Sequence, residues 1–324
     1  MGRPEAGATV GLGNSHFRSS ASPLALLDSG SMRPARASTE QDHRERILRV
    51  LVHLQEHLDD ALDVEELSSV AHLSAFHFHR VFRALVGETA MEHVRRLRLE
   101  RAARQLRYTD DPVIQIALAS GYEAHEAFTR AFGSRFGLPP VEYRRQLRGP
   151  APAADGVCAV PTLRALATEA QPEVQIRSLQ ATRVAFARHV GPYEQVGEAW
   201  GRLMAFAAQR GRVAHPAFAL VYDDPEVTAP ERFRYDACLE VGPEIAAEGA
   251  IGIQLVPAGR FAVALHRGPY EALSQTYGVL LAGWAPRHAC AMAGGPSIER
   301  YLNDPHRTRA PDLQTEVWLR LDES

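Results

Sequence analysis

Two internal repeats, one in each half of the 324-residue chain, constrain its fold more than any other feature of the sequence. The first is the pattern Phe-x-Arg-x-Phe with a glycine five positions later, which occurs at residues 78–87 and again at residues 128–137. The second is a segment of 12 residues (183–194) that recurs at residues 260–271 with eight identical positions. Because repeats of this kind mark duplicated supersecondary units, the sequence predicts two different modules, each built by duplication.

The first repeat predicts two copies of a helix-turn-helix motif. Residues four apart share one face of a helix, so Phe78 and Phe82 should form a buried stripe while Arg80 faces solvent, and the second copy repeats this pattern. The glycine then ends each helix in a conformation that other residues resist. A short helix is predicted before each copy, capped by Asp63 and Asp111. In such motifs the second helix enters the major groove of DNA.

A long helix predicted for residues 90–107 would join the two motifs. It would span about 27 Å, which is close to the ~34 Å between successive major grooves on one face of DNA. Residues 42–148 hold 16 Arg against 16 Asp plus Glu, and the net charge of the chain is −3, so overall charge gives no support for nucleic-acid binding. We expect the arginines of the long helix to form mostly a solvated face: Arg95, Arg96, Arg98, Arg101, Arg104 and Arg107.

Residues 42–148 resemble the AraC/XylS family of DNA-binding regulators. Three segments carry the resemblance: LSSVAHLSAFHFHRVFRALVGE, RRLRLERAARQL and VIQIALASGYEAHEAFTRAFGSRFGLPPVEYRR. Phe76 stands where members of the family often have Trp, and Glu126 could accept a hydrogen bond from cytosine N4 or repel a phosphate, so the target sequence does not carry over. The resemblance implies seven base-facing residues: Phe76, His79 and Arg80 in the first motif, and His125, Glu126, Thr129 and Arg130 in the second.

The second repeat predicts a duplicated strand-helix-strand-strand unit. Each copy begins as a half-buried strand that Gly-Pro breaks before an amphipathic helix. Two such units should pair about a pseudo-twofold axis, and the seam between them is a natural ligand cleft. At an offset of 80 residues, Asp236 in the first copy corresponds to Glu316 in the second. Strand alternation puts Glu316 and Trp318 on one face, and a carboxylate beside a large ring suits a hydrophobic cation.

Residues 172–321 resemble the gyrase-inhibitor-like effector-binding fold. The resemblance rests on Gly-Pro-Tyr after a strand, on GGPSIERYLNDP at residues 294–305 and on TEVWLRL near the end of the sequence. It implies a small-molecule effector with Glu316 as the acid of the pocket, and Trp318, Asp236 and Tyr270 complete the candidate ligand set. Relatives of this fold sense lipophilic cations, inhibit gyrase or occasionally hydrolyse small molecules. The order of the two halves resembles the right-origin-binding type of regulator.

The sequence therefore predicts a multidomain protein. We expect a disordered tail (residues 1–41), an all-α tandem helix-turn-helix domain (42–148), an Ala/Pro-rich linker (149–171) and an α+β effector domain (172–324). No apolar run is long enough to cross a membrane, no secretory signal is visible and the three cysteines form no framework, which favours the cytoplasm. We expect no catalytic residue, cofactor or metal, because the histidines are not spaced as a closed zinc set.

The favoured hypothesis is a regulator that binds double-stranded DNA and responds to a small hydrophobic effector, with a cation among the candidates. Two alternatives stay open. The C-terminal half could hydrolyse a small molecule, using Glu316 and a tyrosine, or it could dock a protein such as gyrase or RNA polymerase. The sequence shows no Ser-His-Asp arrangement, metal set or phosphate-binding loop, which counts against an enzyme.

Overall fold

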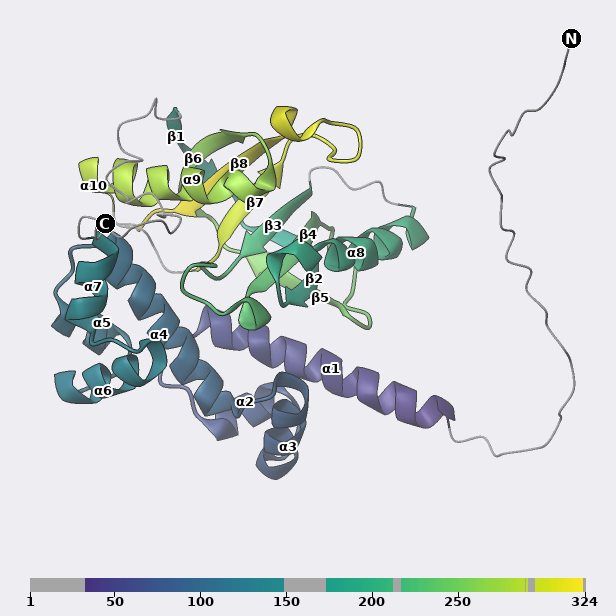
Figure 1. The fold of residues 1–324 in the computed structure, drawn as a ribbon. Helices are drawn as coiled ribbons and strands as arrows, with labels where there is room; N and C mark the ends of the chain where they lie inside the picture. Colours follow the sequence, from purple (N-terminus) through teal and green to yellow (C-terminus); the bar gives the residue numbers. More distant parts are fainter. Residues whose placement is uncertain (1–32, 149–172, 212–216, 289, 291–294, 323–324) are drawn as a thin grey trace, which may run out of the picture.

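The computed structural model describes residues 33–148, 173–211, 217–288, 290 and 295–322. Its first half is helical and its second half is built on one antiparallel sheet with helices (Figure 1), so the expected fold class is confirmed. The helices of the first half are α1 (Arg33–Glu56), α2 (Val64–Val70), α3 (Ala75–Val86), α4 (Ala90–Tyr108), α5 (Val113–Ala119), α6 (His125–Phe136) and α7 (Pro140–Arg148).

Helices α2 and α3 form the first helix-turn-helix, and the local sequence sets their ends. The Asp63 carboxylate accepts a hydrogen bond from the backbone N–H of Glu66 at 2.8 Å and so begins α2. The Ser74 hydroxyl accepts from the N–H of His77 at 3.4 Å and begins α3 in the same way. Helix α3 ends at Gly87, whose φ of +85° is a conformation that favours glycine.

Helices α5 and α6 form the second helix-turn-helix, which starts differently from the prediction. Pro112, not Asp111, is the N-cap of α5, and no side chain caps that helix. The Asp111 carboxylate instead accepts a hydrogen bond from the Thr109 hydroxyl at 2.7 Å. Helix α6 ends at Gly137 with a φ of +78°, as α3 does at its own glycine. The four predicted core phenylalanines are buried: Phe78, Phe82, Phe128 and Phe132.

The 19-residue helix α4 holds the two motifs at a fixed separation. Thr89 and Glu92 form a capping box at its start, and the helix spans about 28 Å. Its N-terminal part buries Val94 in the core of the first motif. Its C-terminal part buries Leu99 and Leu106 in the core of the second motif. One continuous helix therefore contributes to the cores of both motifs.

The second half forms an eight-stranded sheet with the order β1-β6-β8-β7-β3-β4-β2-β5. Each copy of the second repeat supplies three strands and a helix, and the copies meet where β3 pairs with β7. The two remaining strands lie at the edges of the sheet: β1 pairs with β6, and β5 pairs with β2. The strands are β1 (Val174–Leu179), β2 (Thr182–Val190), β3 (Ala217–Val221), β4 (Arg234–Glu240), β5 (Ile251–Val256), β6 (Gly259–Arg267), β7 (Ser297–Tyr301) and β8 (Gln314–Arg320).

The two faces of the sheet carry different side chains. One face is covered by α8 (Gly197–Gln209) and α9 (Leu273–Gly278), and α9 continues through a π-helical turn (Val279–Trp284) into α10 (Ala285–Arg287). Small residues such as Ala185 and Ala262 let these helices approach. The opposite face carries larger apolar side chains: Val184, Phe186, Phe218, Leu220, Phe261, Val263 and Trp318.

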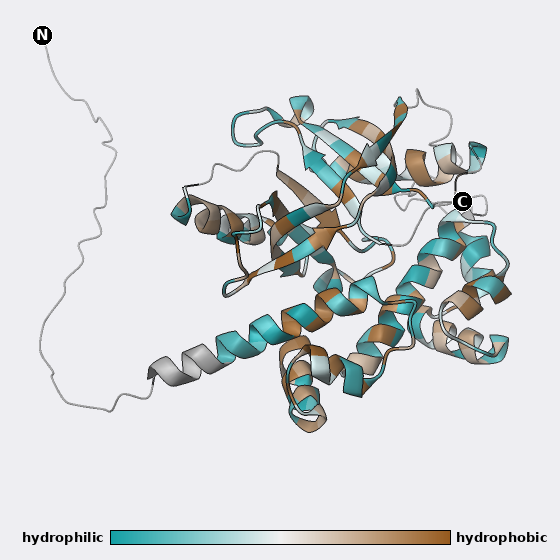
Figure 2. Cartoon of the chain, turned by 180° about the vertical axis from the view of Figure 1, so that it is seen from behind, coloured by the Kyte–Doolittle hydropathy of each residue, from teal (hydrophilic) through white to brown (hydrophobic). Residues whose placement is uncertain are grey.

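Helix α1 covers part of this second face and also belongs to the helical half. Leu48 and Val52 pack on the sheet, while Ile47, Val50 and Leu54 on another side of the helix pack against the first helix-turn-helix. Figure 1 shows α1 lying between the sheet and α2 and α3, and Figure 2 shows its brown apolar residues gathered toward that contact. The two halves of the chain therefore share one helix.

The approach of α1 to the sheet depends on Gly252 in β5. A β-carbon at this position would lie 2.5 Å from the Phe186 ring and 3.0 Å from the Leu48 side chain. Polar contacts extend the interface, because the N–H of Gly249 donates to the Glu45 carboxylate at 2.7 Å. A larger side chain at position 252 would therefore force the Phe186 ring, and with it the Leu48 side chain of α1, to shift.

The expected boundary between tail and first domain is corrected by this helix. Residues 33–41, expected to belong to a disordered tail, are helical because they continue α1. The rest of the expected tail and the whole expected linker (149–171) lie outside the described residues. Within the parts of the chain that the structure describes, no helix is both long and apolar enough to cross a membrane.

Candidate functional sites

The predicted base-facing residues of the first motif lie together on the exposed side of α3. Phe76, His79 and Arg80 are all exposed, and Phe76 keeps 73% of its surface accessible. The Arg80 guanidinium lies over the Phe76 ring, 5.7 Å from its centroid. An exposed aromatic ring stacked with an arginine offers an apolar surface and a forked donor in one place, which suits contacts with bases in a groove.

The second motif presents three of its four predicted residues in the same way. His125, Glu126 and Arg130 are exposed on α6, while Thr129 is only partly exposed. The Thr129 hydroxyl is buried and has no hydrogen-bond partner among the described residues. The structure thus brings His125, Glu126 and Arg130 to one open face, whereas Thr129 lies between that face and the core.

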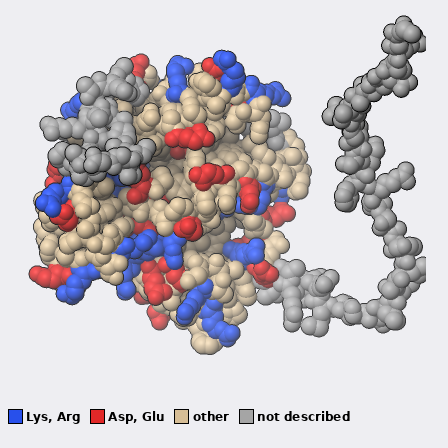
Figure 3. Space-filling view, viewed as in Figure 1, with Lys and Arg blue, Asp and Glu red and all other residues tan. Residues whose placement is uncertain are grey.

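The arginines of α4 do not form the solvated face that the sequence suggested. Arg96 is buried between Glu88 and Glu100, with ion-pair distances of 2.9 Å to each. Arg107 pairs with Glu226 from the effector half. Acidic side chains therefore compensate much of the positive charge of α4. Figure 3 shows red and blue side chains mixed over the helical half.

Glu316 and Trp318 lie on the second face of the sheet, as strand alternation predicts. The Arg177 guanidinium donates to Glu316 at 2.7 Å, and the indole N–H of Trp318 donates to the same carboxylate at 3.0 Å. The Trp318 ring lies between Arg177 and Arg300, at 5.7 and 5.3 Å from its centroid. Glu316 thus already has a cationic partner within the chain.

Asp236 lies on the same face but is completely buried. Its carboxylate accepts two hydrogen bonds from Arg188, at 2.8 and 2.7 Å, and one from the Tyr222 hydroxyl at 2.9 Å. Burial alone would lower the pKa of the Arg188 guanidinium, but the Asp236 carboxylate raises it above its usual value. Arg188 also donates to Gln55 of α1 at 3.0 Å. This pair joins the sheet to α1 and leaves Asp236 no open side for a ligand.

A second buried carboxylate, Glu299 in β7, lies on the opposite face among aromatic residues. Three tyrosine hydroxyls donate to it: Tyr277 at 3.0 Å, Tyr301 at 2.9 Å and Tyr193 at 3.2 Å. Burial raises the pKa of Glu299 above its ordinary value, and the three tyrosine hydrogen bonds oppose that rise. Sequence analysis did not select this residue.

Further aromatic residues complete the surroundings of Glu299. Tyr235 shares a hydrogen bond of 2.7 Å with Tyr301, and the indole N–H of Trp200 donates to the Tyr235 hydroxyl at 2.9 Å. Tyr270, the fourth predicted ligand residue, packs edge-on against Tyr301 with ring centroids 5.5 Å apart. Tyr270 is therefore on this side of the sheet and not beside Glu316. We call Glu299, Tyr193, Trp200, Tyr235, Tyr270, Tyr277 and Tyr301 the Glu299 cluster.

The Glu299 cluster lies at the seam between the two copies of the repeat. Glu299 pairs directly with Ala219 of β3 across the seam, and the offset of 80 residues matches the same two positions in the sequence. Both copies contribute tyrosines to the cluster. A comparison of the two copies would have shown an acid where its counterpart is alanine, and that asymmetry is the sequence signal for a site at the seam.

Among the described residues, no three His, Cys, Asp or Glu side chains gather as metal ligands would. Cys238 is buried and Cys290 is partly exposed, and both are free thiols.

Two family models match the chain. A helix-turn-helix domain matches residues 67–146, and a GyrI-like small molecule binding domain matches residues 172–322. The first model covers the two motifs and helix α4 between them. The second covers the whole sheet with its helices, including the Glu299 cluster.

Three curated relatives match the helical half. Regulatory protein SoxS of Salmonella typhimurium is 31% identical over 105 residues, which are 32% of this chain and 98% of SoxS. The uncharacterized HTH-type transcriptional regulator YbfP of Bacillus subtilis is 36% identical over 102 residues, 32% of this chain and 35% of YbfP. Right origin-binding protein of Escherichia coli is 34% identical over 96 residues, 30% of this chain and 33% of that protein. The chain thus matches only about a third of the length of the last two relatives.

Two exposed recognition helices on one rod, joined to a duplicated sheet with an acid at its seam, define a helix-turn-helix protein with a small-molecule-binding domain. The chain belongs to the AraC-type family of helix-turn-helix regulators, and its second half is a GyrI-like domain.

Proposed function

We propose that this protein is a transcription regulator that binds specific sequences of double-stranded DNA in the cytoplasm and whose Glu299 cluster binds a small hydrophobic cation. The observation that carries the effector part is the buried Glu299 carboxylate, held by three tyrosine hydroxyls and by no cationic side chain among the described residues. A carboxylate in this state is costly to bury unless it gains a positive partner.

The DNA-binding part rests on the geometry of the helical half. Helices α3 and α6 carry exposed arginines. The length of helix α4, which joins the two motifs, is close to the separation of successive major grooves. One chain can therefore contact two grooves without a second copy. SoxS, which is called a regulatory protein, matches this half over nearly its whole length.

The effector part rests on the chemistry of the Glu299 cluster. The faces of Tyr, Trp and Phe rings attract cations, and the cluster adds a carboxylate to six aromatic rings. A cationic ligand would replace tyrosine hydrogen bonds to Glu299 with a charge pair and gain contact with the rings. Glu316, by contrast, is already paired with Arg177, so we place the ligand's charge at Glu299.

The effector site is tested with Glu299→Gln and its matched control Glu316→Gln in the full chain. The probes are benzyltrimethylammonium and its neutral isostere neopentylbenzene, measured by titration calorimetry. Glu299→Gln should weaken the cation by about 1–3 kcal/mol, the scale of a hydrogen bond to a charged group, and leave the neutral probe nearly unchanged. Loss of cation binding in Glu316→Gln alone would move the site to the other face of the sheet.

The DNA-binding site is tested with Arg80→Ala and Arg130→Ala. Each should cost about 1–3 kcal/mol on a selected DNA site and relax specificity at one position. Arg145→Ala is the matched control, because Arg145 is exposed on α7 and already pairs with Glu142 at 2.6 Å. Equal affinity of all three variants for the selected site would show that neither arginine contacts a base.

Hydrolysis by the effector half is the second candidate, because Glu299 with its tyrosines is also a set of groups able to move protons. The regulatory names of the relatives favour binding over turnover. Recovery of unchanged ligand after long incubation with the full chain supports the regulator. Steady release of a product, lost in Glu299→Gln, supports the hydrolase.

A further inference from the structure

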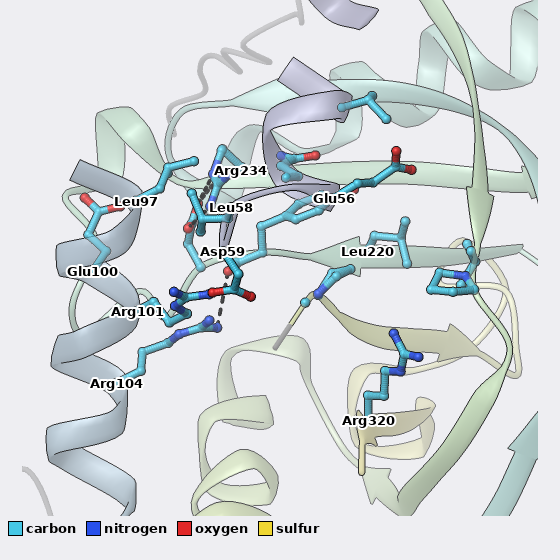
Figure 4. Close-up of a pocket in the computed structure, with 18 of the residues that line it drawn as sticks. Glu56, Leu58, Asp59, Leu97, Glu100, Arg101, Arg104, Leu220, Arg234 and Arg320 are labelled. Atoms are coloured by element: carbon cyan, nitrogen blue, oxygen red, sulfur yellow. Dashed lines mark hydrogen bonds and ion pairs between the residues drawn. The ribbon is translucent and has the colours of Figure 1, made fainter. Parts of the chain in front are cut away.

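A cleft of about 680 Å³ lies between the two halves of the chain, on the face of the sheet opposite the Glu299 cluster (Figure 4). Its size falls in the range of small-molecule sites, about 300–1,000 Å³. Helices α1 and α4 form one side, and strands β3, β4 and β5 with the end of β8 form the other. Apolar side chains make up much of the walls: Val52, Leu97, Leu220, Val256, Pro257 and Pro296.

Arg104 extends into this cleft from α4 without an acidic partner. Its guanidinium donates to the backbone carbonyl of Tyr222 at 3.3 Å, and the described residues place no carboxylate within ion-pair distance of it. Burial lowers the pKa of Arg104, and the nearby Asp223 and Asp224 carboxylates oppose that shift only in part. A buried cation in this state gains from an anion.

Arg320 extends into the same cleft from β8. It donates to the carbonyl of Ala258 at 3.2 Å, and in the described part of the chain it too lacks a carboxylate partner. Figure 4 shows Arg104 and Arg320 reaching toward the same space from opposite sides. The two guanidinium groups thus belong to different halves of the protein.

The other charges around the cleft are either paired or solvated. Arg234 pairs with Asp223 at 2.6 Å, and Arg101 pairs with Asp59 at 2.5 Å. Two further acidic side chains, Glu56 and Asp322, are exposed at the rim, where water screens them. Glu100 pairs with Arg96 and Arg135, and Asp224 accepts a hydrogen bond from the Tyr108 hydroxyl at 3.0 Å. Among the described residues, Arg104 and Arg320 are therefore the two lining arginines that lack a carboxylate within ion-pair distance.

We propose that the cleft is a second small-molecule site, which binds an organic anion with an apolar body and holds its charged group with Arg104 and Arg320. Guanidinium groups bind carboxylates and phosphates through paired hydrogen bonds, and the apolar walls accept the rest of the molecule. Because each arginine belongs to a different half, the bound anion fastens the DNA-binding half to the sheet.

The test uses octanoate as the probe and octylammonium as its cationic counterpart, titrated into the full chain. Octanoate should bind and octylammonium should not compete with it. Arg104→Gln and Arg320→Gln should each weaken octanoate about tenfold or more, the scale of one charge-assisted hydrogen bond. Arg309→Gln is the matched control, since Arg309 is 85% exposed and pairs with Asp312 at a distant turn.

Glu299→Gln separates this proposal from the proposed effector site. It should leave octanoate binding unchanged while it weakens the cationic probe of that site. Octanoate binding that survives both arginine substitutions, or that disappears in Glu299→Gln, would overturn the second site.

A further variant tests the site even if the arginine variants do not fold. Leu255 lines the cleft and is 56% exposed, so Leu255→Trp should fold and place a fluorophore beside the site. A bromine-labelled octanoate should quench this added fluorescence, and unlabelled octanoate should restore it. An octanoate complex without added quenching would place the anion elsewhere and refute the proposal.

Discussion

Arg232 of the effector half donates to Glu88 of the DNA-binding half at 2.8 Å. Glu88 directly follows Gly87, where recognition helix α3 ends, and its other carboxylate oxygen accepts from His93 and Arg96 of the rod. Arg232 lies three residues before Tyr235 of the Glu299 cluster. One ion pair and a three-residue stretch of chain therefore connect the proposed effector site with the end of helix α3.

Replacing Arg232 should uncouple the two sites without unfolding the protein. The pair is partly exposed, so Arg232→Gln should lower the free energy of unfolding by under about 1 kcal/mol. The change in DNA affinity caused by benzyltrimethylammonium should shrink, with a coupling energy of about 1–3 kcal/mol in the parent protein. Anisotropy titrations with and without the cation measure this. Glu231→Gln, at the exposed neighbouring position, should keep the parental response, and an unchanged response in Arg232→Gln would exclude this route.

His93 should make stability depend on pH between about 6.5 and 4. Burial lowers the pKa of His93 from 6.5 to about 4, although Glu88 opposes the shift. Between these pH values His93 binds a proton in the unfolded chain but not in the folded chain. The contribution of His93 to the free energy of unfolding is therefore present above pH 6.5 and is lost as the pH falls toward 4. The slope can approach about 1.4 kcal/mol per pH unit.

Urea unfolding of the parent and of His93→Gln at several pH values measures this effect. The variant should show a flatter profile between pH 6.5 and 4. Hydrogen bonds from His93 and Arg96 outweigh burial and hold the pKa of Glu88 at about 2, below its ordinary 4.5. The contribution of Glu88 to the free energy of unfolding is therefore lost at lower pH, as the pH falls from 4.5 toward 2. A slope that persists in His93→Gln above pH 4.5 would assign the effect to another group.

Asp236 should be required for stability and not for ligand binding. Asp236→Asn leaves Arg188 buried with an uncompensated charge, which should cost about 3–5 kcal/mol of unfolding free energy. Glu316→Gln is the comparison, because the partner Arg177 is 41% exposed and water can compensate it. Chemical denaturation gives both values. Equal, small losses in the two variants would mean that the Asp236 pair is no more important than a surface pair.

The effector half should fold alone but with lower stability than in the full chain. A fragment of residues 173–324 lacks α1 and would expose the apolar face that Leu48 and Val52 cover. We expect a cooperative thermal transition at a lower temperature, with binding of a hydrophobic dye, because exposed apolar area costs free energy. A fragment that melts at the same temperature as the effector half in the full chain would show that the contact with α1 contributes nothing.

Regular local signals made the helical half predictable from sequence. Phe78 and Phe128 with their partners, and the glycines at positions 87 and 137, repeat in one register, and each feature acts within one or two turns of helix. The prediction failed at Asp111, because the adjacent Pro112 takes the cap position. It also failed for Arg101 and Arg107 of α4, since their acidic partners Asp59 and Glu226 lie far away in the sequence.

The effector site could be predicted only in part, because it is assembled from distant segments. The duplication indicated a seam, and the seam is where the Glu299 cluster lies. Sequence analysis selected Glu316 because Trp318 is two residues away, whereas the five tyrosines of the Glu299 cluster come from five separate elements. Nothing local marks Glu299 as their common partner. The contact of α1 with β5 could not be predicted either, since an apolar stripe on a helix does not show which surface packs against it.

The sharing of α1 between two cores also sets the order in which the protein can mature during synthesis. Leu48 leaves the ribosome long before Gly252, the β5 residue against which it packs. At about 5–20 residues per second, the roughly 200 residues between them take about 10–40 s to translate. Through that interval one apolar side of α1 has no partner and is open to chaperones or to neighbouring nascent chains. The contact between the two halves therefore forms only after the ribosome has nearly finished the effector half.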